Sequence, residues 1–136
     1  MSKSDKDTGS FIQLTDSADV IQKKIRKAVT DSNSHVTYDP ENRPGVSTLI
    51  DIDAACSGLE PEEIEEACML KAMNTGEYKR EVSDKLIEHL KPIQQEYMRL
   101  MADREHLKGV LKQGADKANE IAAKTYQDVC KIVGMD

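Results

Sequence analysis

Apolar residues recur at helical spacing along most of the chain, with polar residues between them. Near the start, Ile21, Ile25 and Val29 follow one another at steps of four residues, which places them on one face of a helix. The preceding Thr15-Asp16-Ser17 supplies N-cap candidates. We therefore predict a first helix over about residues 16–29.

Two shorter helices are predicted after a connection, residues 30–45, that is rich in Asp, Ser, Asn and Pro. The apolar positions from 46 to 56 predict a helix that stops near Gly58, because glycine readily adopts the left-handed conformation of a helix C-cap. Pro61 suits the first turn of the next helix. That helix is expected to run to about Met73.

The C-terminal half continues the helical spacing. Apolar residues keep this spacing across Pro92, so residues 77–102 predict one long helix with a kink or two abutting helices. Asp103 can cap a further helix, and a last one is expected after Gly114. The fold class is thus an all-α bundle of five or six helices. We expect its core to contain Ile21, Ile25, Leu86, Leu90, Ile93, Tyr97, Ile121 and Val129.

Composition agrees with a small helical domain. The 136 residues are 38% hydrophobic and 32% charged, with one Phe and no Trp, which favours helices over a β-sandwich. This length suffices to bury a core without disulfides or metals. No apolar run approaches the roughly 20 residues that span a bilayer, so we expect no membrane association.

The charge is unevenly distributed. The formal net charge is −6, but residues 44–70 carry seven acidic residues and no Lys or Arg, whereas the rest of the chain is nearly balanced. Locally basic faces are therefore compatible with RNA binding, although a strong nonspecific electrostatic attraction is not expected. The acidic residues at 60–66 could hold a cation, but carboxylates in the first turn of a helix already have a structural role.

The cysteines and histidines form no recognised ligand pattern. They are Cys56, Cys68, Cys130, His35, His89 and His106. None of the histidines lies three or four residues from another His, Cys or paired carboxylate in a recognised ligand pattern, and there is no CxxC pair. We predict no metal site, and we expect the cysteines to be small buried hydrophobes in a reducing compartment.

The first residues carry a motif. Met1-Ser2-Lys3-Ser4 reproduces four of the five residues of the Lys-Met-Ser-Lys-Ser signature of class I aminoacyl-tRNA synthetases, a match that is short enough to arise by chance. Further motifs, however, follow in the order found in tryptophanyl-tRNA synthetases of the bacterial and mitochondrial type, which the whole chain resembles. They are Phe11-Ile12-Gln13-Leu14-Thr15-Asp16-Ser17, Lys27-Ala28-Val29-Thr30-Asp31-Ser32, Tyr38-Asp39-Pro40, Pro44-Gly45-Val46-Ser47, Pro92-Ile93 and Gly114-Ala115-Asp116-Lys117-Ala118.

The chain departs from the family pattern in two respects. The first Lys of the signature is absent, and Thr48 stands where the family usually has Asn. The resemblance implies that residues 1–10 are the remnant of a flexible ATP-binding loop and that residues 11–136 form a C-terminal helical domain of the tRNA anticodon-binding type. The catalytic Rossmann domain of the family is expected to be missing, so this part alone is expected to be inactive.

The resemblance also implies the chemistry. Lys3 occupies the place of the catalytic lysine that neutralises the β- and γ-phosphates of ATP while tryptophan is activated. Ser2 and Ser4 are expected to bind ATP or to fix the loop, and Met1 to lie near the adenine. ATP is then a substrate, with Mg²⁺ in the complete enzyme, and no cofactor is bound by the chain alone.

The expected partner of the helical domain is tRNA(Trp). Candidate contacts are exposed lysines, although ordinary helix ion pairs with Glu120 and Asp128 would also explain those nearest the C-terminus. The candidate lysines are Lys23, Lys24, Lys27, Lys117, Lys124 and Lys131. A helical protein-interaction module without RNA binding is the alternative function, for which the acidic residues 44–70 offer a contact surface.

The family further implies a homodimer in the complete enzyme. Three segments look closer to animal mitochondrial members of the family than to bacterial ones. They are Met73-Asn74-Thr75, Tyr78-Lys79 and residues 129–134. We therefore expect the mitochondrial matrix, with the bacterial cytoplasm as the alternative. Residues 1–10 are polar and hold both charge signs, unlike a transit peptide, so a targeting peptide is expected to have preceded this part.

Overall fold

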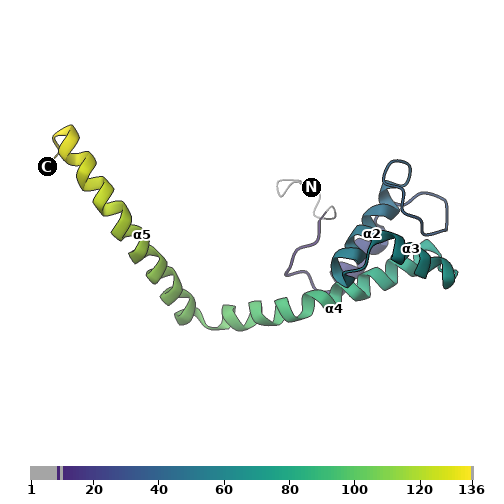
Figure 1. Cartoon of the computed structure of the whole chain (residues 1–136). Coiled ribbons are helices and arrows are strands. Elements are labelled where there is room, and N and C mark those ends of the chain that lie inside the picture. The colour runs from purple at the N-terminus through teal and green to yellow at the C-terminus, as the bar shows by residue number, and fades with distance from the viewer. Residues whose placement is uncertain (1–8, 10, 136) are drawn as a thin grey trace. The chain divides into compact units, whose positions relative to one another are not determined.

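The computed structural model of the protein describes Gly9 and residues 11–135. As predicted, this part of the chain is all-α, with five helices and one isolated antiparallel bridge between His35 and Asn74 (Figure 1). The helices are α1 (Ala18–Lys27), α2 (Pro44–Ser57), α3 (Pro61–Leu70), α4 (Thr75–Ala102) and α5 (Arg104–Val133). The chain divides into two compact units, Met1–Gln94 and Gln95–Asp136, which we call unit 1 and unit 2.

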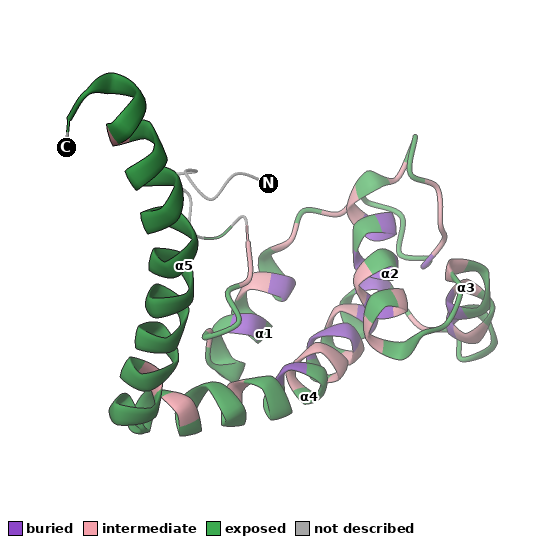
Figure 2. Ribbon diagram, turned by 60° about the vertical axis from the view of Figure 1, so that its left-hand side comes forward, coloured by how far each residue is buried: buried purple, intermediate pink, exposed green. Residues whose placement is uncertain are grey.

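Unit 1 contains the hydrophobic core. Each of its helices contributes apolar residues at steps of three or four, the spacing that puts side chains on one face. Leu86 is only partly buried but packs against this core. Figure 2 shows the buried positions as purple segments on α1 to α4. The buried hydrophobic residues are Ile21, Ile25, Val36, Val46, Leu49, Ile50, Ile64, Cys68, Tyr78, Val82 and Leu90.

Local capping explains where several helices begin and end. Gly58 ends α2 at φ 73°, a left-handed conformation that costs glycine little. At the start of α3, Glu60 and Glu63 form a capping box, in which each side chain accepts from the other residue's backbone N–H. These caps confirm the predicted end of α2 and start of α3.

The C-terminal part of the described chain forms two helices, α4 and α5, where the sequence predicts at least three. Pro92 lies inside α4, which continues to Ala102 as one helix, and Asp103 caps α5 by accepting a hydrogen bond from the backbone N–H of His106 at 3.0 Å. Gly114 lies within α5 and separates no helices, so that predicted boundary is wrong. A glycine inside a helix lowers the stability of the helix by about 1 kcal/mol relative to alanine but does not by itself end it. A glycine ends a helix when it adopts the left-handed C-cap conformation, as Gly134 does at φ 70°.

The apolar stripe of unit 2 is uncovered in this structure. No described residue of α5 is buried, and Ile121 and Val129 are 74% and 49% exposed (Figure 2). Ile93 and Tyr97 of α4 are exposed as well. The prediction that these four residues belong to the core is therefore wrong, because helical spacing shows that a stripe exists but not which surface covers it. No helix among residues 11–135 is long and apolar enough to cross a membrane.

Gly45 permits a close approach between the start of α2 and the backbone just after α1, at Val29 and Thr30. A Cβ at this position would overlap the carbonyl oxygen of Val29, a backbone atom that cannot rotate away. We expect Gly45→Ala to destabilise unit 1 by about 1–3 kcal/mol, the usual cost of overpacking. Urea unfolding followed by far-UV circular dichroism measures this change.

Gly114→Ala is the matched control for that substitution. A Cβ at Gly114 meets no other atom within 4 Å, and the residue lies inside a helix. The control should therefore stabilise α5 by up to about 1 kcal/mol through the higher helix propensity of Ala. Equal effects of both substitutions would contradict the close packing at Gly45.

Candidate nucleic-acid interface

A surface groove of about 770 Å³ lies between α1 and the N-terminal half of α4, both within unit 1. Four basic side chains line it against two acidic ones. The basic residues are Lys23, Arg26, Lys79 and Arg80, and the acidic ones are Asp19 and Asp84. This is a locally basic surface on a chain of net negative charge.

Three of the four basic groups in the groove are free to meet a ligand. Lys23, Arg26 and Arg80 are exposed, and none of them pairs with a carboxylate among residues 11–135. Lys79 differs, because its ammonium donates to the carbonyl oxygen of Ala28 at 2.8 Å and to Oγ1 of Thr30 at 3.0 Å. It thereby ties the end of α1 to α4.

Lys24 was also predicted to contact RNA, and the structure gives it a local role. Its Nζ lies 2.6 Å from Oδ2 of Asp16 and 2.9 Å from the carbonyl oxygen of Phe11, and it sits 5.4 Å from the Phe11 ring centroid. Burial works to raise the pKa of Asp16, but Lys24 and the backbone N–H of Gln13 outweigh it and the pKa is lowered. These contacts attach the segment before α1 to the helix, and RNA contact by Lys24 stays a prediction.

The other predicted lysines lie outside the groove. Lys27 is exposed at the end of α1, and three more are exposed along α5 in unit 2. We call these three, Lys117, Lys124 and Lys131, the α5 stripe. The ion pairs with Glu120 and Asp128 that could have explained the stripe are not formed among the described residues.

The sequence analysis missed Arg26, Lys79 and Arg80 as site residues. Lys79-Arg80 is a visible basic pair at the start of a predicted helix, but nothing in the spacing indicates that it lies beside α1. That proximity arises because Tyr78 and Val82 of α4 share the core with Ile21 and Ile25 of α1. The groove is therefore a consequence of tertiary packing.

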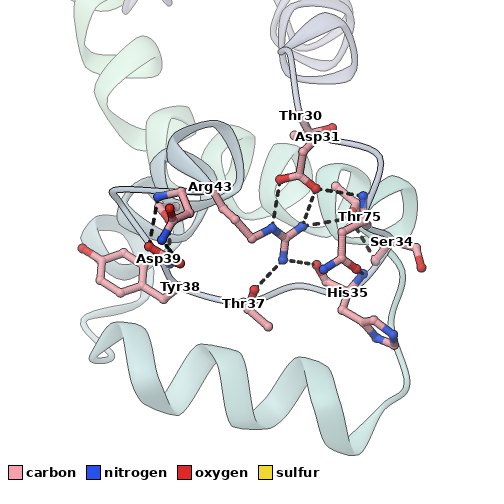
Figure 3. Close-up of polar contacts among 12 residues, drawn as sticks. Thr30, Asp31, Ser34, His35, Thr37, Tyr38, Asp39, Arg43 and Thr75 are labelled. Atoms are coloured by element: carbon pink, nitrogen blue, oxygen red, sulfur yellow. Dashed lines mark hydrogen bonds and ion pairs between the residues drawn. The ribbon is translucent and has the colours of Figure 1, made fainter.

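Arg43 organises the connection between α1 and α2 (Figure 3). Its Nε and Nη2 donate to the two carboxylate oxygens of Asp31, each at 2.9 Å. Its remaining N–H groups donate to Thr37 Oγ1 and to the carbonyl oxygens of Asn33 and His35. The bidentate pair with Arg43 holds the pKa of Asp31 below its ordinary value. A connection without regular structure is thus held in one conformation.

A buried ion pair joins α2 to α4. Asp53 is fully buried, and its two carboxylate oxygens accept from the ammonium of Lys85 at 3.0 and 2.9 Å and from the Tyr78 hydroxyl at 3.2 Å. Lys85 also pairs with Glu81 at 3.1 Å. Burial works to lower the pKa of Lys85, but these two carboxylates outweigh it and the pKa is raised. The cluster is satisfied by protein groups, and its partly exposed member Lys85 also lines a second surface pocket of about 350 Å³.

The predicted ATP-binding residues Met1, Ser2, Lys3 and Ser4, and the flexible loop expected to contain them, lie outside the described residues apart from Gly9. Within the described ranges, no group of three or more His, Cys, Asp or Glu side chains could hold a metal ion. Burial is the largest cause that raises the pKa of the Cys56 and Cys68 thiols. A raised pKa disfavours the nucleophilic thiolate, as expected for packing residues.

Comparison with known proteins identifies the family of the chain. A sequence profile of the family "tRNA synthetases class I (W and Y)" matches residues 1–91. Tryptophan–tRNA ligase 1 of Streptomyces coelicolor is 39% identical over 136 residues, covering 99% of this chain and 39% of the relative. The Halalkalibacterium halodurans tryptophan–tRNA ligase is 40% identical over 135 residues, covering 99% of this chain and 40% of the relative.

A chloroplastic/mitochondrial tryptophan–tRNA ligase of Arabidopsis thaliana is also 40% identical, over 134 residues that cover 98% of this chain and 32% of the relative. The crystal structure of tryptophanyl-tRNA synthetase from Mycoplasma pneumoniae matches the fold with a TM-score of 0.70 at 26% identity, covering all of this chain and 41% of that one. This chain therefore spans about two fifths or less of the length of these relatives. The match to the family profile and the likeness along the whole chain confirm the resemblance seen in the sequence: the chain belongs to the W and Y family of class I tRNA synthetases.

Proposed function

We propose that the chain is part of a tryptophan–tRNA ligase, to which it contributes an ATP-binding loop and a helical tRNA-binding domain. The observation that carries this proposal is the likeness along nearly the whole chain to proteins named tryptophan–tRNA ligase, at 39–40% identity. In the first step of such a reaction the tryptophan carboxylate attacks the α-phosphorus of ATP. The bond to the β-phosphate oxygen breaks, so pyrophosphate leaves and tryptophanyl adenylate forms.

Lys3 is the residue proposed to act in that step. As the bond to the leaving group breaks, negative charge moves onto pyrophosphate, and a positioned ammonium stabilises this charge most in the transition state. Ser2 and Ser4 supply hydroxyl groups for ATP or for the loop, and Met1 lies near the adenine. The family resemblance supports these assignments. Mg²⁺ would add further positive charge at the phosphates in the complete enzyme.

The second proposed activity is binding of tRNA(Trp) by the helices. An anticodon is a single-stranded loop, which proteins read through base edges and stacking. The basic groove and the exposed lysines of α5 are two places that could meet the RNA. By family resemblance the complete enzyme is proposed to be a homodimer.

For the compartment we propose the mitochondrial matrix, with the bacterial cytoplasm as the alternative. The support is the similarity of residues 73–79 and 129–134 to animal mitochondrial members. One relative also carries the name chloroplastic/mitochondrial.

An acidic surface favours a different function for the helical part, namely a protein-interaction module without RNA binding. Glu60, Glu62, Glu63 and Glu66 are exposed in and just before α3, and residues 44–70 carry no basic side chain to neutralise them. A basic partner protein would fit this surface. RNA binding by the chain decides between the two proposals.

Binding of two tRNAs tests the proposed function. We expect the 136-residue chain to bind a tRNA(Trp) transcript about tenfold more tightly than a tRNA(Tyr) transcript, since one or two lost base contacts correspond to roughly 1–3 kcal/mol. Filter binding at fixed ionic strength measures both affinities. Equal affinities would contradict a role in selecting tRNA(Trp), and no binding of either RNA would favour the interaction module.

A further inference from the structure

We propose that the groove between α1 and α4 binds the sugar–phosphate backbone of RNA and does not read its bases. The proposal rests on the proposed function in naming RNA as the ligand, but it assigns a particular surface and a particular kind of contact. Three observations carry it: the free cations of the groove, the engagement of its other polar groups, and the contacts that fix α1 against α4.

The free cations come from two helices that are distant in sequence. Lys23 and Arg26 project from α1, and Arg80 projects from the first turns of α4. All three are exposed and have no carboxylate partner among the described residues, so binding a phosphate would break no existing ion pair. Cations on both walls of a groove suit a chain of phosphates better than a single small anion.

The groove offers little with which to read a base. No aromatic side chain lines it, so a base has no stacking surface there. The Gln22 amide, which could hydrogen-bond a base edge, donates to Oδ1 of Asp84 at 3.2 Å, and the Ser83 hydroxyl donates to the carbonyl oxygen of Arg80 at 2.7 Å. Without a stacking ring, the exposed cations of the groove are best placed to contact phosphates, and phosphate contacts position a nucleic acid without reading its sequence.

The same hydrogen bonds fix the two walls of the groove. Gln22 of α1 bonds to Asp84 of α4, and Lys79 of α4 bonds to the backbone just after α1. Ile21 and Ile25 pack in the same core as Tyr78 and Val82 beneath the groove. The spacing between the free cations is therefore set before RNA arrives, which reduces the ordering cost of binding.

The test compares two triple variants with the same change in charge. Lys23→Gln/Arg26→Gln/Arg80→Gln neutralises the groove. The control variant, Lys91→Gln/Arg99→Gln/Arg104→Gln, neutralises one lysine and two arginines that are exposed outside the groove and to which no RNA contact is assigned. Binding of tRNA(Trp) and of an unrelated RNA hairpin is measured by filter binding over a salt series. Circular dichroism confirms equal helix content, which is expected because none of the six side chains is buried.

We expect the groove variant to lose about tenfold or more in affinity for both RNAs near 0.1 M salt. The slope of log affinity against log salt should become shallower by about 2–3, because each lost phosphate contact removes roughly 0.7–0.9. The control variant should stay within about twofold of the wild type. Unchanged affinity and slope in the groove variant, or an equal loss in both variants, would overturn the proposal.

Asp84→Asn provides a test of opposite sign. The Asn side chain can still accept the hydrogen bond from Gln22, but it no longer repels phosphate. We expect affinity for both RNAs to rise by about two- to fivefold, the effect of an exposed charge. Weaker binding would contradict the assignment, because a purely structural role of Asp84 could only lower affinity.

The two RNAs separate this proposal from the proposed function. Loss of hairpin and tRNA binding in the groove variant supports the backbone site even if the wild type shows no preference for tRNA(Trp). Conversely, a clear preference for tRNA(Trp) that persists in the groove variant with an unchanged salt slope supports the function and overturns the site. Absence of RNA binding by the wild type overturns both.

Discussion

Replacing Lys3 by Ala in a complete enzyme is expected to slow tryptophan-dependent ATP–pyrophosphate exchange by about 100-fold, because a positioned cation at the leaving group is worth roughly 3 kcal/mol in a site that excludes water. A suitable enzyme is a chimaera in which the preceding part of the Streptomyces coelicolor tryptophan–tRNA ligase 1 is joined ahead of Met1. The loss should appear mainly in kcat, since the lysine acts as charge develops and not when tryptophan binds.

Two controls make this result specific. Lys6→Ala removes a nearby lysine to which the signature assigns no role, and it should leave exchange within about threefold of the chimaera. The 136-residue chain assayed alone should show no exchange, because holding ATP and tryptophan at reacting distance can supply about 7–11 kcal/mol of the barrier reduction and needs a binding site for both. A Lys3→Ala chimaera that keeps its kcat, or exchange by the chain alone, would contradict the proposed role.

Replacing Lys85 by Met is expected to destabilise unit 1 by about 3 kcal/mol. The substitution preserves most of the side chain's volume but leaves the fully buried Asp53 carboxylate with the Tyr78 hydroxyl as its side-chain partner. Removing one member of a buried ion pair typically costs about 3–5 kcal/mol. We expect the lower end because Lys85 is partly exposed and water can reach its place. Amide exchange at core positions of α2 reports on unit 1 alone.

Two further variants distinguish the buried charge from other causes. Glu81→Gln weakens the partly exposed pairs that Glu81 makes with Lys85 and Lys71, leaves the Asp53–Lys85 pair intact, and should cost less than about 1 kcal/mol. The double variant Lys85→Met/Asp53→Asn should recover part of the loss, because the uncompensated charge is gone. A cost below about 0.5 kcal/mol for Lys85→Met would show that Asp53 does not depend on this lysine.

The sequence by itself determined the helical class and most helix boundaries. Gly58 ends α2 and Asp103 caps α5, as the residue types predict. Such signals are reliable because a cap depends on hydrogen bonds and steric limits within a few residues. The ordered motifs likewise identified the family, since they need no knowledge of the fold.

The sequence also indicated parts of the candidate site, but only separately. Lys23 was singled out as one of a basic group on the first helix, and the Lys79-Arg80 pair is visible at the start of the fourth. Their meeting in one groove depends on how α1 packs against α4. That packing is set by apolar side chains more than fifty residues apart, such as Ile21 and Tyr78, whose pairing no local pattern specifies.

Tertiary structure also decided which residues are buried. Ile25 and Ile121 both lie on apolar stripes of similar spacing, yet the first is buried in unit 1 and the second is 74% exposed in α5. The buried pair of Asp53 and Lys85 likewise looks, in the sequence, like two ordinary surface charges. An apolar stripe or a charged side chain is a property of one helix and can be seen in the sequence. Burial also requires a complementary surface on another element, and only the folded chain shows whether that surface is present.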